Sequence, residues 1–137
     1  MLNLSKTNVA QLEEAGYEFE LIVPDTVEGT GAFIKVRGKD SKIARQHSRK
    51  MFQEAQMKEQ KARRQGKDAP QPTLEEIEES INKTAYLRII SWRGMSEDGK
   101  TELPFNEENA LRILNEHDWI RTAVLENSND GSKFRFD

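Results

Sequence analysis

Apolar and polar residues alternate near the N-terminus in the pattern of a β-hairpin. In the segment YEFELIV, Tyr17, Phe19 and Leu21 alternate with two glutamates, which is the period of two that a half-buried strand produces. A glycine-containing turn follows, and the next segment, AFIKV, holds the β-branched and aromatic residues that strands favour. The pattern predicts strands over 17–23 and 32–37, joined as a hairpin that must pack against other elements.

Two longer segments have the spacing of amphipathic helices. A basic helix is expected over 41–64, capped by Asp40 or Ser41, with an apolar or neutral residue at every fourth position from Ile43 to Ala55. The stretch 66–72 contains two prolines and a glycine, and is interpreted as a linker. A second helix is expected over 73–93. It begins with the capping box Thr73-Leu-Glu-Glu76, and its apolar positions recur three or four residues apart. Those positions are Leu74, Ile77, Ile81, Ala85, Ile89 and Trp92.

The remaining pattern predicts two short helices and a polar end. Asn106 can cap a helix over 106–116, and a last helix is expected over 118–127. The residues 128–137 are polar apart from two phenylalanines and are interpreted as a flexible tail.

The order of the elements, with strands first and helices later, indicates an α+β fold that is mainly α-helical. The hairpin of 17–37 is expected to pack against about four helices in a single domain over 1–127. Within it, residues 41–65 form the basic helix and residues 73–127 the rest of the helical part.

The composition indicates a small hydrophobic core, and the charges are unevenly distributed along the chain. The 137 residues include no cysteine, so disulfide scaffolds, thiol catalysis and cysteine-based zinc sites are excluded. Hydrophobic residues make up 35 % of the chain and charged residues 33 %, with a net charge of −3. That near-neutrality hides a basic block, since residues 35–67 hold twelve Lys and Arg against three acids, and the segments on either side are acidic. Such a block fits a solvated helix face, an acidic protein partner or nucleic acid.

The residue types that carry catalysis or bind metals lack the spacing that such sites need. His47 and His117 each stand alone, without a second histidine three or four residues away. No G-x-S-x-G motif is present, and Gly29-Thr30-Gly31 lies between strands rather than before a helix, where a phosphate-binding loop would be. We therefore expect no enzyme, no cofactor and no metal. The chain also has no signal peptide or membrane-spanning apolar run, so a cytoplasmic location is expected.

The two tryptophans are either core residues or interface anchors. Tryptophan is enriched at interaction hot spots, and a small core fits a protein that completes its burial against a partner. We hypothesise a partner-binding surface supported by apolar residues of the helical part, with basic side chains of the 41–65 helix steering the partner. The apolar residues are Ile81, Ile89, Trp92 and Trp119. The basic residues are Arg45, Arg49, Lys50, Lys58, Arg63 and Arg64.

Two segments together carry a family resemblance. The first is Thr30–Arg45, TGAFIKVRGKDSKIAR, an extended segment that enters a basic helix. The second spans Trp92–Trp119 and contains, in order, W-R-G, an acidic turn, L-P-F-N, E-N-A-L-x-I-L and D-W-I. This order resembles the tail assembly chaperones of long, non-contractile-tailed bacteriophages and prophages, although Asp118 stands where many relatives have proline.

The resemblance implies a transient role in assembling a viral tail. Proteins of that family bind the tape measure protein, help recruit tail tube subunits in the cytoplasm of the bacterial host, and are absent from the finished virion. Two alternatives remain: a virion-resident tail completion or head–tail connector protein, and a small nucleic-acid-binding regulator that uses the 35–67 block. Self-association is left open, nucleic acid is disfavoured because acids interrupt the basic block, and no membrane partner is expected.

Overall fold

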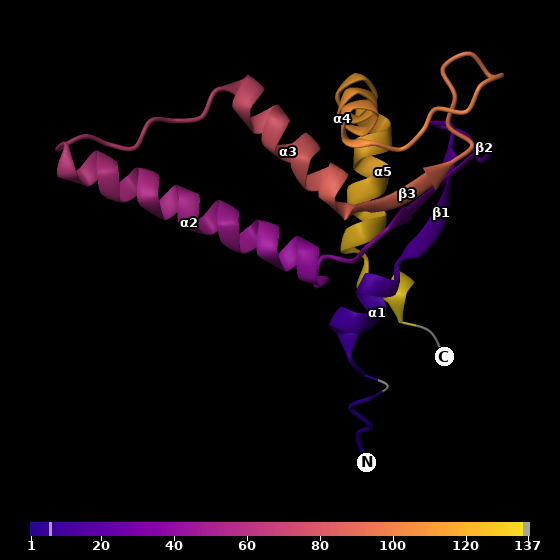
Figure 1. Ribbon diagram of the computed structural model, residues 1–137, viewed down its shortest axis with the longest axis horizontal. Helices are drawn as coiled ribbons and strands as arrows, with labels where there is room; N and C mark the ends of the chain where they lie inside the picture. Colours follow the sequence, from indigo (N-terminus) through magenta and orange to yellow (C-terminus); the bar gives the residue numbers. More distant parts are fainter. Residues whose placement is uncertain (6, 136–137) are drawn as a thin grey trace.

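Three antiparallel strands form the sheet of this protein, in the order β1-β2-β3 (Figure 1). They are β1 (Tyr17–Ile22), β2 (Gly29–Val36) and β3 (Ile89–Arg93). The computed structural model describes residues 1–5 and 7–135. The hairpin expected from the sequence is confirmed, with β2 starting three residues earlier than predicted. β2 is the central strand, and its Ile34 pairs with Phe19 on one side and Trp92 on the other.

The third strand corrects one sequence prediction. The helix expected over 73–93 ends at Arg88, and Ile89 already has extended backbone angles (φ −88°, ψ 130°). Ala85, Ile89 and Trp92 satisfy a helical spacing, but Ile89 and Trp92 also suit a strand that can pair with β2. Lys35 pairs with Ser91 but Val36 pairs with Ile89, so β3 carries one extra residue at this point, and this bulge lets both side chains turn inward although they are three residues apart. The tertiary pairing therefore overrides the helical periodicity.

The helices agree more closely with the sequence pattern. Those expected over 41–64, 106–116 and 118–127 are confirmed within two residues, as is the capping box at Thr73, whose Oγ1 accepts from the Glu76 N–H (3.1 Å). A short first helix was not predicted. Among the described residues, no helix has both the length and the apolar character needed to cross a bilayer. The helices are α1 (Val9–Ala15), α2 (Lys42–Arg64), α3 (Leu74–Arg88), α4 (Glu107–Glu116), α5 (Asp118–Asn129) and a 3₁₀ turn, η1 (Gly131–Phe134).

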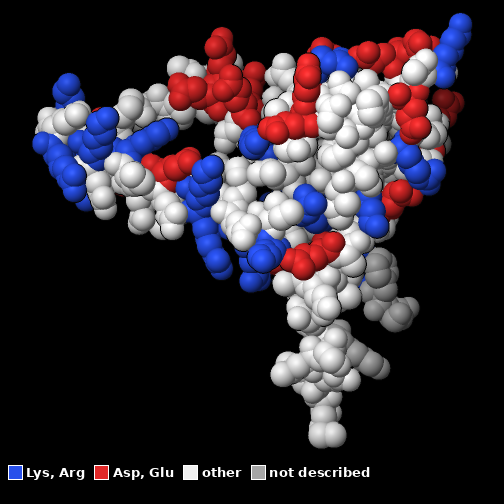
Figure 2. Space-filling model, viewed as in Figure 1, with Lys and Arg blue, Asp and Glu red and all other residues white. Residues whose placement is uncertain are grey.

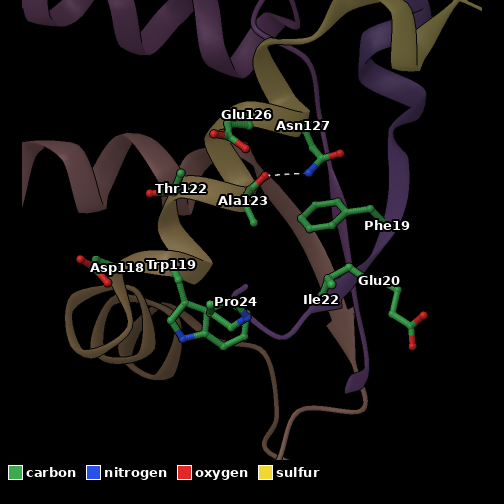
Figure 3. Close-up of a pocket in the computed structure, with 10 residues that line it drawn as sticks. All are labelled: Phe19, Glu20, Ile22, Pro24, Asp118, Trp119, Thr122, Ala123, Glu126 and Asn127. Carbon is green, nitrogen blue, oxygen red and sulfur yellow. Dashed lines mark hydrogen bonds between the residues drawn. The ribbon is translucent and has the colours of Figure 1, made fainter. Parts of the chain in front are cut away.

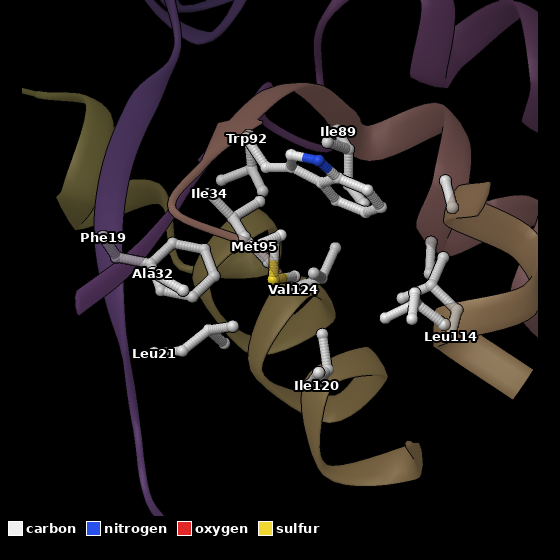
Figure 4. Close-up of a cluster of buried hydrophobic side chains, with 14 of the residues drawn as sticks. Phe19, Leu21, Ala32, Ile34, Ile89, Trp92, Met95, Leu114, Ile120 and Val124 are labelled. Atoms are coloured by element: carbon white, nitrogen blue, oxygen red, sulfur yellow. The ribbon is translucent and has the colours of Figure 1, made fainter. Parts of the chain in front are cut away.

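The core lies between one face of the sheet and the C-terminal helices. α5 contacts both β1 and β2, and α3 packs on α4 and α5. Figure 4 shows Phe19, Leu21 and Ile34 from the sheet approaching Ile120 and Val124 of α5. The fold class is therefore α+β, mainly helical, with the N-terminal hairpin packed on helices as predicted.

The C-terminal residues differ from the flexible tail that the sequence pattern indicates. α5 continues to Asn129, and η1 then places Phe134 in the core, where it is 1 % exposed. The ring of Phe134 meets that of Tyr17 edge-on, with 6.3 Å between centroids. Phe134 therefore docks a segment that is otherwise largely polar. Residues 136 and 137, the end of the expected tail, lie outside the described residues.

Candidate partner-binding surface

α2 and α3 form a helical arm that projects away from the sheet. We define the arm as α2, the loop 65–73 and the first two turns of α3. Figure 1 shows α2 leaving the body near the sheet and α3 returning to it from the far end. The arm begins where Ser41 caps α2 by accepting from the Ala44 N–H (3.4 Å). Within the 23 residues of α2, only Ala44 and Ala62 are buried, so most of this helix is surface.

One contact fixes how the two helices of the arm face each other. Nε2 of His47 lies 3.1 Å from Oγ1 of Thr84, close to the base of the arm. Side chains three, four or seven residues apart share a helix face, so Met51 lies on the His47 side of α2. By the same rule, Ile81 and Ile77 lie on the Thr84 side of α3. We call these side chains, with Leu74 one turn further out, the inner face of the arm.

The inner face is apolar but incompletely covered. Met51 is 40 % exposed, Ile81 37 % and Leu74 72 %, with Ile77 similar to Met51. Figure 2 shows open space between the two helices of the arm, with Lys and Arg gathered on α2 and acidic residues along the start of α3. Monomeric proteins seldom expose several apolar side chains together without a binding purpose. The arm therefore presents two apolar stripes, one on α2 and one on α3, that remain partly exposed.

The surroundings of His47, at the base of the arm, disfavour its positively charged form. Burial lowers the pKa of His47, and the neighbouring positive charges of Arg88, Lys83 and Lys50 lower it further. The Thr84 hydroxyl donates to the Ser80 carbonyl (3.0 Å), so Oγ1 of Thr84 accepts from the Nε2–H of His47. A neutral His47 ring makes this contact, which orients α2 on α3, in the tautomer that carries its hydrogen on Nε2.

The six basic residues expected to steer a partner do not form a single patch. Arg45 and Arg63 are five helical turns apart and share one side of α2 with Arg49, whereas Lys58 lies on the opposite side. Arg45 approaches Asp40 (3.7 Å), and Arg63 is bonded to Glu59 (2.6 Å). Lys50 and Arg64 lie between these two sides, so the positive charge surrounds α2 rather than marking one face.

The four apolar residues expected to support the surface divide into two groups. Ile89 and Trp92 belong to the core, at 3 % and 9 % exposure, and offer nothing to a partner in this conformation. The Trp92 Nε1–H donates to the Leu103 carbonyl (2.8 Å), which ties the loop before α4 to the sheet. Ile81 is on the inner face of the arm, and Trp119 lies in a separate groove beside β1.

Sequence reasoning missed part of the arm's inner face. Leu74, Ile77 and Met51 belong to the apolar stripes of the predicted helices, but they are not among the residues predicted to support the partner-binding surface. A usable signal was present, since two amphipathic helices separated by a nine-residue polar loop can bury each other only where they overlap. Within the part of the chain that the structure describes, no group of three or more His, Asp or Glu side chains is arranged to hold a metal ion.

The sequence matches the YdaY prophage protein family over residues 39–137. This span covers more than two thirds of the chain. The protein belongs to the YdaY prophage protein family. No curated protein and no solved structure is significantly similar to it.

The region shared with the YdaY family begins just before α2. It includes the whole arm, β3 and the C-terminal helices, and leaves α1, β1 and β2 outside. Membership makes this a phage or prophage protein, which agrees with the broader part of the resemblance. A role in tail assembly stays a prediction.

Proposed function

We propose that this YdaY-family protein is a tail assembly chaperone, which binds the tape measure protein, helps recruit tail tube subunits, and does not remain in the virion. The observation that carries the proposal is the inner face of the arm, where the apolar side chains of Met51, Ile77 and Ile81 are all exposed. The prophage family and the resemblance of the W-R-G and L-P-F-N segments to tail chaperones support it.

The arm suits a helical client. An amphipathic helix with apolar residues at i, i+3 or i+4, and i+7 can insert its stripe between two others, as in helix-in-groove recognition. A tape measure protein is long and helical, so before assembly it exposes stripes of this kind. Positive charge around α2 would attract acidic stretches of such a client and raise the association rate.

A solubility assay with a matched control tests the proposal. The tape measure protein from the same prophage would be co-expressed with the parent protein or with the double variant Met51→Ser/Ile77→Ser. Each substitution removes apolar surface worth about 1 kcal/mol on binding, so we expect about 30-fold weaker affinity and loss of soluble client. Val27→Ser, which changes an exposed apolar residue in the β1–β2 loop, should behave as the parent.

Three results would count against this function. The double variant could keep the tape measure protein soluble as well as the parent does, which would mean that the arm does not bind it. The protein could be present in purified particles, which favours a virion-resident tail completion or connector protein. Binding to DNA with a steep salt dependence, and none to the tape measure protein, would favour the nucleic-acid-binding regulator.

A further inference from the structure

A second surface lies between β1 and α5 and shares no residue with the arm. It is a groove of about 440 Å³. Figure 3 shows Phe19 and Ile22 of β1 on one side, Trp119 and Ala123 of α5 on the other, and Pro24 near Trp119. Trp119 is only partly buried here, so an indole face is available inside the groove. A largely apolar floor between a strand and a helix suits an apolar side chain of a partner.

The strand beside this groove has an unused edge. The Arg37 N–H donates to the carbonyl of Arg88, the residue just before β3. Val36, one residue earlier, therefore turns its backbone groups to the opposite side, toward its β1 partner Tyr17. Backbone groups alternate along a strand, so the N–H and C=O groups of Glu18 and Glu20 point away from β2. Within residues 1–5 and 7–135, no other strand or loop backbone pairs with these outward groups. This edge can accept a further strand.

Two carboxylates mark the ends of the groove. Asp118 and Glu126 both line it from α5 and are eight residues apart, about 12 Å along the helix. Neither takes part in an ion pair among the described residues. In an extended chain, residues i and i+4 point to the same side about 13 Å apart. The spacing of the two acids therefore matches two basic side chains with one apolar side chain midway between them.

We propose that the β1–α5 groove binds an extended, basic protein segment as a fourth strand of the sheet. Its backbone pairs with the outward groups of Glu18 and Glu20, and its central apolar side chain packs on Ala123, next to Trp119. Lys or Arg two residues before and two residues after that side chain meet Asp118 and Glu126. This is recognition by strand addition, in which the backbone supplies affinity and the side chains supply selectivity. It does not depend on the function proposed for the arm.

The probe for this proposal is a synthetic peptide, acetyl-Thr-Lys-Thr-Val-Thr-Lys-Thr-amide, with a matched peptide in which both lysines are glutamates. Binding is followed on the full chain by two-dimensional ¹⁵N NMR at low salt. We expect the lysine peptide to shift the amide signals of Glu18 and Glu20 in a saturable way. The glutamate peptide should bind at least about tenfold more weakly, since it places like charges together.

Two further comparisons separate strand addition from general attraction. Asp118→Asn/Glu126→Gln changes only surface groups and should weaken the lysine peptide about fivefold. N-methylation of the peptide amide nitrogens that face β1 removes their hydrogen-bond donors. This change should abolish binding, although the charge of the peptide stays the same. The proposal is overturned if millimolar lysine peptide leaves the Glu18 and Glu20 signals unmoved, if its shifts map to α2 instead, or if the N-methylated or glutamate peptide binds equally well.

Discussion

Gly94, the glycine of the W-R-G segment, is the residue at which this fold makes its sharpest steric demand. It follows β3 with φ at +76°, a region that side-chain-bearing residues avoid. A Cβ built on Gly94 would lie 2.3 Å from the carbonyl oxygen of Gly31 and 3.2 Å from Cα of Ala32. Both neighbours are backbone atoms of β2, so no side-chain rotation can relieve the contact. Gly94→Ala must therefore move β2 against β3.

The structure supplies a control that isolates this steric effect. Gly99 has nearly the same φ, +79°, but a Cβ there would meet nothing within 4 Å. Gly99→Ala should therefore lose only the backbone term, about 1–2 kcal/mol. Gly94→Ala carries that term and a further overpacking term of about 1–3 kcal/mol. Its total, about 2–5 kcal/mol, is a large fraction of the 5–15 kcal/mol typical of a folded domain.

Urea unfolding at pH 7, followed by tryptophan fluorescence and far-ultraviolet circular dichroism, measures both variants. We expect Gly94→Ala to unfold at lower urea than Gly99→Ala, and its Tm to fall by at least about 4 °C more. Equal losses in the two variants would refute the reasoning. They would mean that the end of β3 does not approach Gly31 as described, and that only the backbone conformation requires glycine in W-R-G.

Three more substitutions test the body and the arm. Burial raises the pKa of Glu13, and the negative charge of Asp40 raises it further. The protonated Glu13 therefore contributes stability that is fully present below the pKa of the unfolded state. This stability is lost as the pH rises through the pKa of the folded state. Glu13→Gln should gain about 1 kcal/mol in urea unfolding at pH 7, and an equal gain at pH 4 would contradict this. Thr73→Ala should weaken the start of α3 by about 1 kcal/mol, measured as faster hydrogen exchange at the Glu76 amide, with Thr73→Ser as the control. Phe134→Ala should lower the free energy of unfolding by about 3–5 kcal/mol; a change below about 0.5 kcal/mol, as at exposed sites, would show that the C-terminal turn is not docked.

Local chemistry made much of this fold predictable. The hairpin could be predicted because Tyr17, Phe19 and Leu21 alternate with acids, and alternation persists wherever one strand face is buried. Helix starts could be predicted because a capping side chain acts over only three residues. The side chains of Ser41, Thr73 and Asn106 each accept a hydrogen bond from the backbone N–H three residues later. These signals depend on neighbours in sequence, so no knowledge of the tertiary structure is needed to read them.

The errors concern residues whose state is decided by distant partners. Ile89 and Trp92 satisfy a helical period, and only their pairing with β2, more than fifty residues earlier, selects a strand. Phe134 stands in a polar segment, and its burial depends on Tyr17 and α1, which come from the other end of the chain. Ile89 and Trp92, which were expected to support the partner-binding surface, are buried in the core for the same reason. A tryptophan at the end of an apolar stripe fits a core as well as an interface.

The uncovered outer end of α2 follows from the unequal lengths of the two helices of the arm. Measured from the contact of His47 with Thr84, α2 continues about 26 Å to Arg64, whereas α3 continues only about 15 Å to Leu74. α3 therefore cannot cover the last two turns of α2, even if the arm closed. The loop covers part of them, since the Lys67 N–H donates to the Ala62 carbonyl (2.9 Å) and Ala62 is buried. The helix lengths could be predicted from the sequence, but the contact that sets their offset could not. Exposure of the outer end of α2 is thus a consequence of tertiary register, which periodicity alone does not give.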